Sequence, residues 1–300
     1  MTRCGGRRLR AAWSFIAVML AGVTVPAGAR SAPATNGPLE ALGRVLERED
    51  PHAFADTTLP RLADLGPQQR SWLAQRIAAW PVGRRVATWA FLQVGMPYQL
   101  GPLGEGVPPD TDPVIEFRTT DCAVLNLVAT ALAHTQDAGG EVEAMALANY
   151  RGGAISYSTR YHFTTDRLDA SPYYRDITQR VGGADCRRRR VTLNRRADGS
   201  RWIPIEWSRT REVVYLPRAL GTRFGRWYQE GRVPEALGVA FVQTSRMVDG
   251  LDVVHESMLW RGRTILHASS RTGRVVTMPW TDFLLGPGRH YDGFVLFEYR

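Results

Sequence analysis

The sequence contains no lysine; all 38 of its lysine-or-arginine residues are arginine. This absence excludes Schiff-base catalysis by lysine, a serine–lysine dyad and the phosphate-binding lysine of a P-loop. Cysteine is scarce as well, with three residues in a chain of 300, so a disulfide-rich scaffold is excluded. The sequence also has no internal repeat and no H-E-x-x-H motif, which removes repeat architectures and a common zinc-protease pattern.

Hydrophobic residues make up 44% of the chain and aromatic residues 10%. A chain of this length can bury a sizeable core, and its hydrophobic and aromatic content is too high for a disordered protein. The formal net charge is +9. No nucleic-acid-binding motif accompanies that charge, so we expect no nucleic-acid partner.

The first 29 residues have the pattern of a secretory signal peptide. Four arginines lie between residues 3 and 10, an apolar stretch follows over 11–25, and residues 27–29 (Ala-Gly-Ala) form a small-residue cleavage site. The apolar stretch is short for a bilayer-spanning helix, and no later run reaches roughly 18 apolar residues. We therefore expect an exported protein, periplasmic or secreted, with no membrane span after cleavage. Cleavage removes the four arginines and no acid, so the net charge falls from +9 to +5.

After this leader, helical patterns come before strand patterns. Apolar residues recur at helical spacing over 39–94, and a Gly/Pro-rich loop covers 95–112. A further helix, capped by Thr120 or Asp121, is predicted to run to about Ala133, and another to cover 137–149. The predicted strands cover 189–193, 201–205, 212–216, 238–244, 252–260, 263–268, 274–278 and 292–299. This order predicts an α+β fold in which helices pack on a mainly antiparallel sheet.

These patterns divide the chain into three parts. A signal peptide covers residues 1–29, an N-terminal helical region at 30–92 packs on the core, and one domain covers 93–300. An arginine-rich insertion is predicted near 183–212. Within it, the four arginines at 187–190 have the character of a solvated face.

One cysteine, Cys122, is placed for chemistry. It lies in the segment Thr-Thr-Asp-Cys at 119–122, where a helix is predicted to start. Unpaired N–H groups and the helix dipole stabilise a thiolate there, so we expect a lowered pKa for this thiol. The same N–H groups can hold an oxyanion that forms at a carbonyl. The competing interpretation is an ordinary small apolar residue on a buried helix.

Two histidines, His255 and His267, lie on neighbouring predicted strands joined by a turn around Arg261. If the turn centres on Arg261, the histidines are directly opposed, and cross-strand partners lie about 4.5–5.5 Å apart at Cβ. One imidazole could then deprotonate a thiol while the other orients it, as in cysteine hydrolases. Half-buried strand histidines and a pair of metal ligands remain open alternatives. A metal amidase would use His162 together with His255 and His267.

Short motifs in a fixed order resemble the NlpC-type papain-like cysteine peptidases. They are G-M-P-Y at 95–98, D-C at 121–122, D-V-V-H at 252–255 and H-A-S-S at 267–270. A more specific segment resembles the N-acetylmuramoyl-L-alanine amidase-like branch of that family. It is Y-R-G-G at 150–153 followed by S-T-R-Y-H-F-T-T-D at 158–166. The resemblance covers roughly residues 85–300.

This resemblance implies a papain-like core, with the catalytic cysteine at a helix N-terminus packed on an antiparallel sheet. It implies cleavage of the amide between N-acetylmuramic acid and L-alanine, in peptidoglycan or its fragments. By carry-over, Cys122 is the nucleophile, His255 the base that becomes the acid, and His267 the orienting residue. Tyr98 and the Cys122 backbone N–H would support the oxyanion. Further residues that match branch motifs are expected to face substrate: Arg160, Tyr161, His162, Ser269 and Ser270.

The chain departs from the family pattern at Ala123, Val124, Leu127, Glu256 and Ser257. The first three replace small hydroxyl residues and a glutamate on the helix that follows the cysteine. The other two stand where the family has a glycine soon after the first histidine. Along a regular strand, Glu256 should point away from His255, because adjacent side chains alternate between faces. The three catalytic residue types are intact, so we expect activity, while the altered helix face bears on bond specificity.

Other functions stay open at this point. One is an endopeptidase that cuts between D-glutamate and the diamino acid, and another is a non-catalytic wall-binding module that has kept the fold. The cysteine mechanism requires no cofactor and no metal. We expect a monomer whose partner is peptidoglycan or a muropeptide. Cys186 matches no motif, and we do not expect it to form a disulfide with Cys122.

Overall fold

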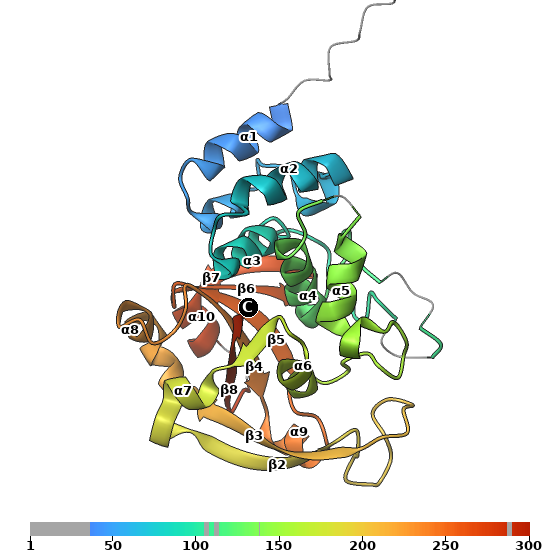
Figure 1. Cartoon of the computed structure of the whole chain (residues 1–300). Helices are drawn as coiled ribbons and strands as arrows, with labels where there is room; N and C mark the ends of the chain where they lie inside the picture. The colour runs from blue at the N-terminus through green and yellow to red at the C-terminus, as the bar shows by residue number, and fades with distance from the viewer. Residues whose placement is uncertain (1–36, 105–107, 111–113, 138, 287–289) are drawn as a thin grey trace, which may run out of the picture. The chain divides into compact units, whose positions relative to one another are not determined.

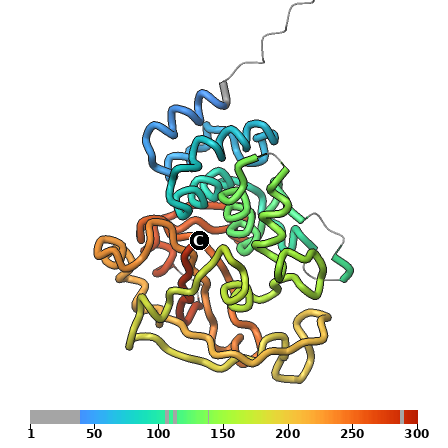
Figure 2. The backbone as a smooth tube through the Cα atoms, in the orientation of Figure 1, coloured from blue at the N-terminus to red at the C-terminus, as the bar shows by residue number. Residues whose placement is uncertain are grey.

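The computed structural model describes residues 37–104, 108–110, 114–137, 139–286 and 290–300. The predicted signal peptide lies outside these residues. Residues Gly37–Arg300 form one compact unit. In Figures 1 and 2 the helices of its N-terminal part follow one another at one end, and the hairpin of β2 and β3 lies at the other.

The α-helices are α1 (Gly37–Leu46), α2 (Pro67–Ile77), α3 (Val82–Phe91), α4 (Cys122–Ala133), α5 (Glu141–Asn149), α6 (Thr164–Ala170), α7 (Thr178–Gly182), α8 (Phe224–Gln229), α9 (Thr244–Val248) and α10 (Trp280–Leu285). Short 3-10 helices are η1 (Pro51–Ala55), η2 (Leu62–Asp64), η3 (Arg151–Gly153), η4 (Gly183–Asp185) and η5 (Arg218–Arg223). The strands are β1 (Tyr174–Asp176), β2 (Arg187–Leu193), β3 (Arg209–Pro217), β4 (Ala236–Val242), β5 (His255–Trp260), β6 (Thr264–Ser269), β7 (Arg274–Pro279) and β8 (Gly293–Tyr299).

The strands form one antiparallel sheet in the order β2-β3-β8-β4-β5-β6-β7, and β1 also pairs with β8. Every residue of β4 is buried, because both faces of the sheet are covered. Ala240 and Val242 belong to the core that α3 and α4 share, whereas Val239 and Phe241 pack with α8 and α10 on the other face. The predicted class, helices on a mainly antiparallel sheet, is confirmed as a mixed α/β arrangement.

The N-terminal helices are joined to the rest of the compact unit by apolar and ionic contacts. Leu42 and Leu73 are fully buried in the same core as α4. Arg70 of α2 forms a buried ion pair with Glu141 of α5 at 2.6 Å. Pro67 occupies the first turn of α2, where its missing N–H has no partner to lose.

Two predicted strand assignments need correction. Residues 201–205 form a loop and not a strand, because the Asn194 side chain binds this backbone directly. Its amide donates to the carbonyls of Ile205 and Trp207, and its oxygen accepts from the N–H of Ile203. Strand β1 was missed, because its three residues are ordered by pairing with β8, which is distant in sequence.

Gly238 of β4 tests how tightly the sheet is packed. It lies opposite Phe297 of β8, and a Cβ at this position would overlap the Phe297 ring. We expect Gly238→Ala to lower the free energy of unfolding by about 1–3 kcal/mol, because the fully buried ring has to shift. Gly43→Ala in α1 is the control, since a Cβ there meets nothing within 4 Å. That control should stabilise by about 0.5–1 kcal/mol. Urea unfolding of both variants measures the difference.

Candidate active site

The N-terminus of α4 is capped by Asp121. Its Oδ1 accepts hydrogen bonds from the N–H groups of Ala123 and Val124, each at 2.9 Å. Its Oδ2 accepts from the N–H of Gly101 at 3.2 Å. The predicted cap is therefore confirmed. It uses the second and third N–H groups of the helix, so Cys122 begins the helix with its side chain on the first turn.

The G-M-P-Y segment, 95–98, is fixed beside this helix end by backbone hydrogen bonds. The Thr120 N–H donates to the carbonyl of the segment's proline at 3.1 Å, and a parallel bridge pairs Tyr98 with Thr120. On its other side the segment is bonded to Val275 of β7. Tyr98, the predicted oxyanion residue, is close enough to Cys122 for the two to interact electrostatically.

The Cys122 thiol is enclosed by protein atoms although the residue is only half-buried. Burial raises the pKa of the thiol, and the carboxylates of Asp121 and Glu256 raise it further. Hydrogen bonds from the backbone N–H groups of Glu256 and of Cys122 itself lower the pKa, but by less. The predicted lowering of this pKa is therefore wrong here, because desolvation and two nearby carboxylates outweigh the helix end.

The raised pKa predicts how Cys122 reacts with iodoacetamide. Below the pKa of a thiol, the reactive thiolate fraction rises about tenfold per pH unit. We expect the alkylation rate of Cys122 to be low at neutral pH and to keep rising between about pH 6 and 9. Mass spectrometry of the Cys122 peptide measures this rate. Cys186, whose pKa is also raised by burial, is the internal reference. A rate plateau below pH 7 would contradict the prediction, since it would indicate a preformed thiolate.

The two predicted histidines are in contact. Nε2 of His255 lies 3.2 Å from Nδ1 of His267, and the ring planes are nearly perpendicular at 89°. Aromatic rings surround the pair: Phe283 stands 4.9 Å from His267 between ring centroids, and Phe241 stands 5.5 Å from His255. His267 is 2% exposed and His255 half-buried, so the pair has one inner and one outer member.

The turn between these histidines differs by one residue from the prediction. Met258 of β5 pairs with Leu266 of β6, which centres the turn on Gly262 and not on Arg261. The histidines are therefore offset by two positions, a diagonal relation across the two strands. The β5–β6 ladder ends at Met258, and the imidazoles meet beyond its end.

Behind the cysteine lies a buried polar cluster around Glu256. Its carboxylate accepts hydrogen bonds from Thr164 and Arg167, both at 2.6 Å, and from Asn126 at 3.4 Å. The Arg167 and Glu256 side chains are each 2% exposed. The hydroxyl of Tyr299 donates to the Asn126 side chain at 2.9 Å. The cluster joins α4, α6, β5 and β8, and the sequence pattern alone did not reveal it.

The segment S-T-R-Y-H-F-T-T-D docks on both sides of His255. Its Thr164 bonds to Glu256, which follows His255. Its Thr165 donates to Asp252 from both the N–H and the hydroxyl, each at 2.7 Å. Glu256 points toward α4 and α6 while His255 contacts β6, so the predicted alternation of these two side chains is confirmed.

Arg160, predicted to face substrate, is placed inside the protein. Its guanidinium binds both carboxylate oxygens of Asp110 at 2.6 and 3.1 Å, and these two side chains are 1% and 2% exposed. It also donates to the Leu103 carbonyl at 2.5 Å and to the Tyr150 hydroxyl at 2.9 Å. In this structure the Arg160 guanidinium therefore binds protein side chains and backbone.

Its neighbours Tyr161 and His162 are also largely enclosed. Tyr161 is 6% exposed, and the Arg151 guanidinium lies 5.5 Å over its ring. Nε2 of His162 lies 2.7 Å from the Tyr157 carbonyl. Burial lowers the pKa of His162. In this structure both side chains therefore contact other parts of the protein, and His162 holds the chain at Tyr157 in place.

The two serines after His267 differ from one another. Ser269 is 6% exposed, and its hydroxyl accepts from the Thr272 N–H at 3.2 Å. Ser270 is exposed in the turn after β6. Ser269 therefore shapes this turn, and Ser270 is the member of the pair that solvent can reach.

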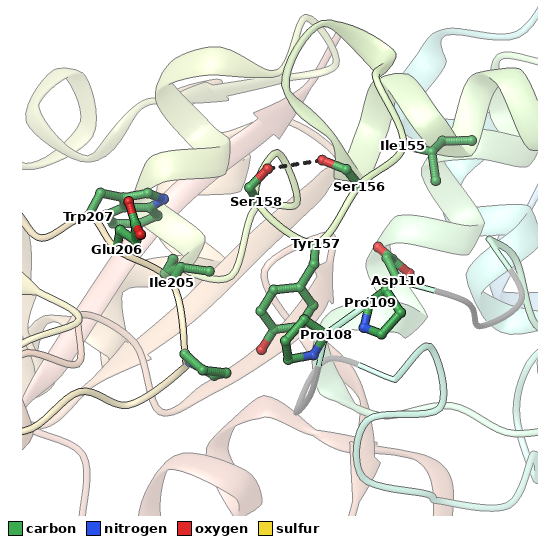
Figure 3. Close-up of a pocket in the computed structure, with 11 residues that line it drawn as sticks. Pro108, Pro109, Asp110, Ile155, Ser156, Tyr157, Ser158, Ile205, Glu206 and Trp207 are labelled. Atoms are coloured by element: carbon green, nitrogen blue, oxygen red, sulfur yellow. Dashed lines mark hydrogen bonds between the residues drawn. The ribbon is translucent and has the colours of Figure 1, made fainter.

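A pocket of about 760 Å³ lies among three loops (Figure 3). The residues that line it come from 108–110, 155–158 and 204–207. Asp110, one of them, is the partner of Arg160, and Tyr157 is the partner of His162. The sequence prediction did not include this pocket, because its walls are far apart in the chain.

Across the described residues, no three His, Cys, Asp or Glu side chains are grouped to hold a metal ion. Cys122 and Cys186 are both free thiols, as expected. Among the helices that the structure describes, none is long and apolar enough to cross a membrane.

Fold and site together define a mixed α/β protein with a cysteine at a helix start and a histidine pair on an antiparallel sheet. The AmiA-like family model, described as N-acetylmuramoyl-L-alanine amidase-like, matches residues 89–286. The match covers well over half of the chain, so the protein belongs to this family. Membership places it among amidase-like hydrolases related to peptidoglycan. No curated protein matches the sequence.

Solved structures share the fold. Protein LPG0564 from Legionella pneumophila, titled with the family model DUF1460, has a TM-score of 0.61 and 17% identity, covering 78% of this chain and 94% of that one. A structure titled as an N-acetylmuramoyl-L-alanine amidase from Bacteroides uniformis has a TM-score of 0.55 and 17% identity, covering 73% and 99%. At this identity the similarity concerns the fold.

Proposed function

We propose that this protein is an exported cysteine amidase that cleaves the bond between N-acetylmuramic acid and L-alanine in peptidoglycan or muropeptides. Family membership supports an amide substrate of this class. One observation supports the cysteine mechanism: His255 and His267 are in contact, and Glu256, which follows His255, is close enough to Cys122 to shift the pKa of its thiol. We assign the core to the NlpC-type papain-like class on the same arrangement.

The roles follow from the contacts. Nε2 of His255 faces His267, so Nδ1 is the nitrogen that we assign to proton exchange with Cys122. The raised pKa keeps the thiol protonated at neutral pH, so His255 takes the proton as the sulfur attacks the carbonyl. Burial also raises the pKa of Tyr98, which keeps its hydroxyl able to donate to the oxyanion.

The rest of the cycle returns each group to its starting state. His255 passes its proton to the nitrogen of L-alanine, the C–N bond breaks, and the free peptide leaves. A thioester remains on Cys122. Water attacks it with His255 as base, which releases the carboxyl group of the muramic acid and restores the thiol.

The experiment is incubation of the purified protein with a defined disaccharide-tetrapeptide, followed by mass analysis of the products. We expect a peptide with a free L-alanine amine and a disaccharide with a free lactyl carboxyl group. A disaccharide that retains L-alanine and D-glutamate would instead indicate an endopeptidase. Binding without any product would indicate a non-catalytic module. Mass analysis of the mature N-terminus after expression in an exporting host tests cleavage after residue 29.

A further inference from the structure

We propose that the pocket among the three loops is a subsite for a neutral pyranose, the amino-sugar part of the substrate. The inference rests on the proposed function, because it assigns one half of that substrate to one place on the protein. The volume of the pocket, about 760 Å³, falls in the range of small-molecule sites, about 300–1,000 Å³.

The walls of the pocket offer flat apolar surfaces. Trp207, Tyr157, Pro108 and Pro109 line it, each with a ring, and Ile205 is also part of the lining (Figure 3). The C–H face of a pyranose packs on an aromatic ring, because the ring face carries partial negative charge. Stem peptides are extended and mostly polar, and they present no comparable flat apolar face.

The orientation of Trp207 is fixed by residues other than those that line the pocket. The Phe163 ring meets it edge-on at 5.7 Å between centroids, and the Arg209 guanidinium lies 4.5 Å over it. Arg209 is in turn held by Asp166 at 2.9 Å. A ring held in this way can bind a ligand without a large loss of side-chain entropy.

The charge of the lining favours the sugar over the peptide. Among the described residues that line the pocket, none is basic, and two are acidic: Asp110 and Glu206. Asp110 is neutralised by Arg160, so Glu206 leaves a net negative charge. This charge repels the carboxylates of a stem peptide. The Glu206 carboxylate can accept hydrogen bonds from sugar hydroxyls, and so can the hydroxyls of Ser156 and Ser158.

The pocket is also tied to the histidine pair. The Tyr157 carbonyl bonds to His162, and two residues later Thr164 bonds to Glu256, next to His255. One short segment therefore forms a wall of the pocket and supports the strand that begins with His255. Sugar binding there and amide cleavage at Cys122 use connected parts of one structure.

The test uses the full chain carrying Cys122→Ala and a probe that contains no scissile peptide bond. The probe is the disaccharide of N-acetylglucosamine and N-acetylmuramic acid with its lactyl carboxyl group blocked as the methylamide. We expect Trp207→Ala to weaken its binding by about tenfold or more in calorimetry. Ser158→Trp, which fills the pocket from an exposed position, should do the same. Trp72→Ala, on α2, is the matched control and should have no effect.

A free stem peptide is the second probe, and neither pocket variant should change its binding. Unchanged disaccharide binding in both pocket variants would overturn the proposal, and so would a loss of peptide binding with sugar binding retained. Glu206→Gln should strengthen binding of the unblocked disaccharide acid relative to its methylamide. These measurements require no turnover, so they separate the subsite from the catalytic assignment. If Cys122→Ala still hydrolyses muropeptides, the mechanism fails while the subsite remains measurable.

Discussion

Cys122→Ala should lower kcat for muropeptide hydrolysis by about 10⁴-fold or more without unfolding the protein. In the proposed mechanism the sulfur forms the bond to the acyl group, and no other described cysteine lies beside the histidine pair, since Cys186 is hydrogen-bonded to Thr178 in another part of the fold. Alanine keeps the helix start, because the cap of α4 uses Asp121 and not the cysteine side chain. Initial rates from product mass, with circular dichroism as the folding control, measure the effect.

The same prediction extends to His255, the residue proposed to exchange the proton. Nucleophile and base act as a unit, so His255→Ala should cost a similar factor, and the double variant with Cys122→Ala should cost no more than either alone. His267→Asn keeps a hydrogen-bonding group beside His255 and should lose less. Cys186→Ala is the matched control and should retain full activity. Substantial turnover by Cys122→Ala would remove the cysteine mechanism, and a fully additive double variant would show that the two residues do not act in one step.

The local features of the site follow from local sequence. Asp121 before an apolar helical run predicts a capped helix, and the structure has that cap. The two strands that carry His255 and His267 are equally predictable, because short runs of apolar residues flank a turn that contains a glycine. Their contact was predicted on a turn centred on Arg261, whereas the observed turn centres on Gly262. The two imidazole rings are still in contact, because long side chains reach diagonal cross-strand neighbours.

Features that depend on distant residues were not predictable in this way. The pKa of Cys122 is raised first by burial, then by Asp121 and by Glu256; the burial and the Glu256 contact depend on residues remote in sequence, so the helix end alone gave the wrong sign. Arg160 was predicted to face substrate, but its partner Asp110 comes from a Gly/Pro-rich loop with no periodic signal. Trp207 lies in the segment predicted as an arginine-rich insertion, for which no binding role was expected. In each case the deciding contact joins residues that no spacing pattern relates.

Removing the Glu256 carboxylate should have the largest effect on stability. We expect Glu256→Ala to lower the free energy of unfolding by about 3–5 kcal/mol, because it leaves the Arg167 cation buried without its partner. Both side chains are 2% exposed, so water cannot replace the lost interaction. Thr164 and Asn126 lose an acceptor as well. Urea unfolding at 25 °C, with the slope checked for two-state behaviour, measures the loss.

An exposed pair of the same kind is the matched control. Arg188 and Glu212 form an ion pair at 2.6 Å whose side chains are 52% and 55% exposed. Glu212→Ala should therefore cost less than about 1 kcal/mol, since solvent screens that pair. If Glu256→Ala and Glu212→Ala lower the free energy of unfolding equally, burial is not the cause of the stability that the Glu256 ion pair contributes.

Replacing both partners distinguishes stability from positioning. The double variant Arg167→Met with Glu256→Leu removes both charges, and apolar replacements of a buried pair are often neutral or stabilising. We expect this variant to recover most of the stability lost in Glu256→Ala. We expect kcat to stay at least about tenfold low, because the Glu256 side chain joins β5, which carries His255, to α4, which carries Cys122, and to α6. Full recovery of both quantities would mean that the ion pair only holds the fold, and recovery of stability alone would mean that it also positions the cysteine and the histidines.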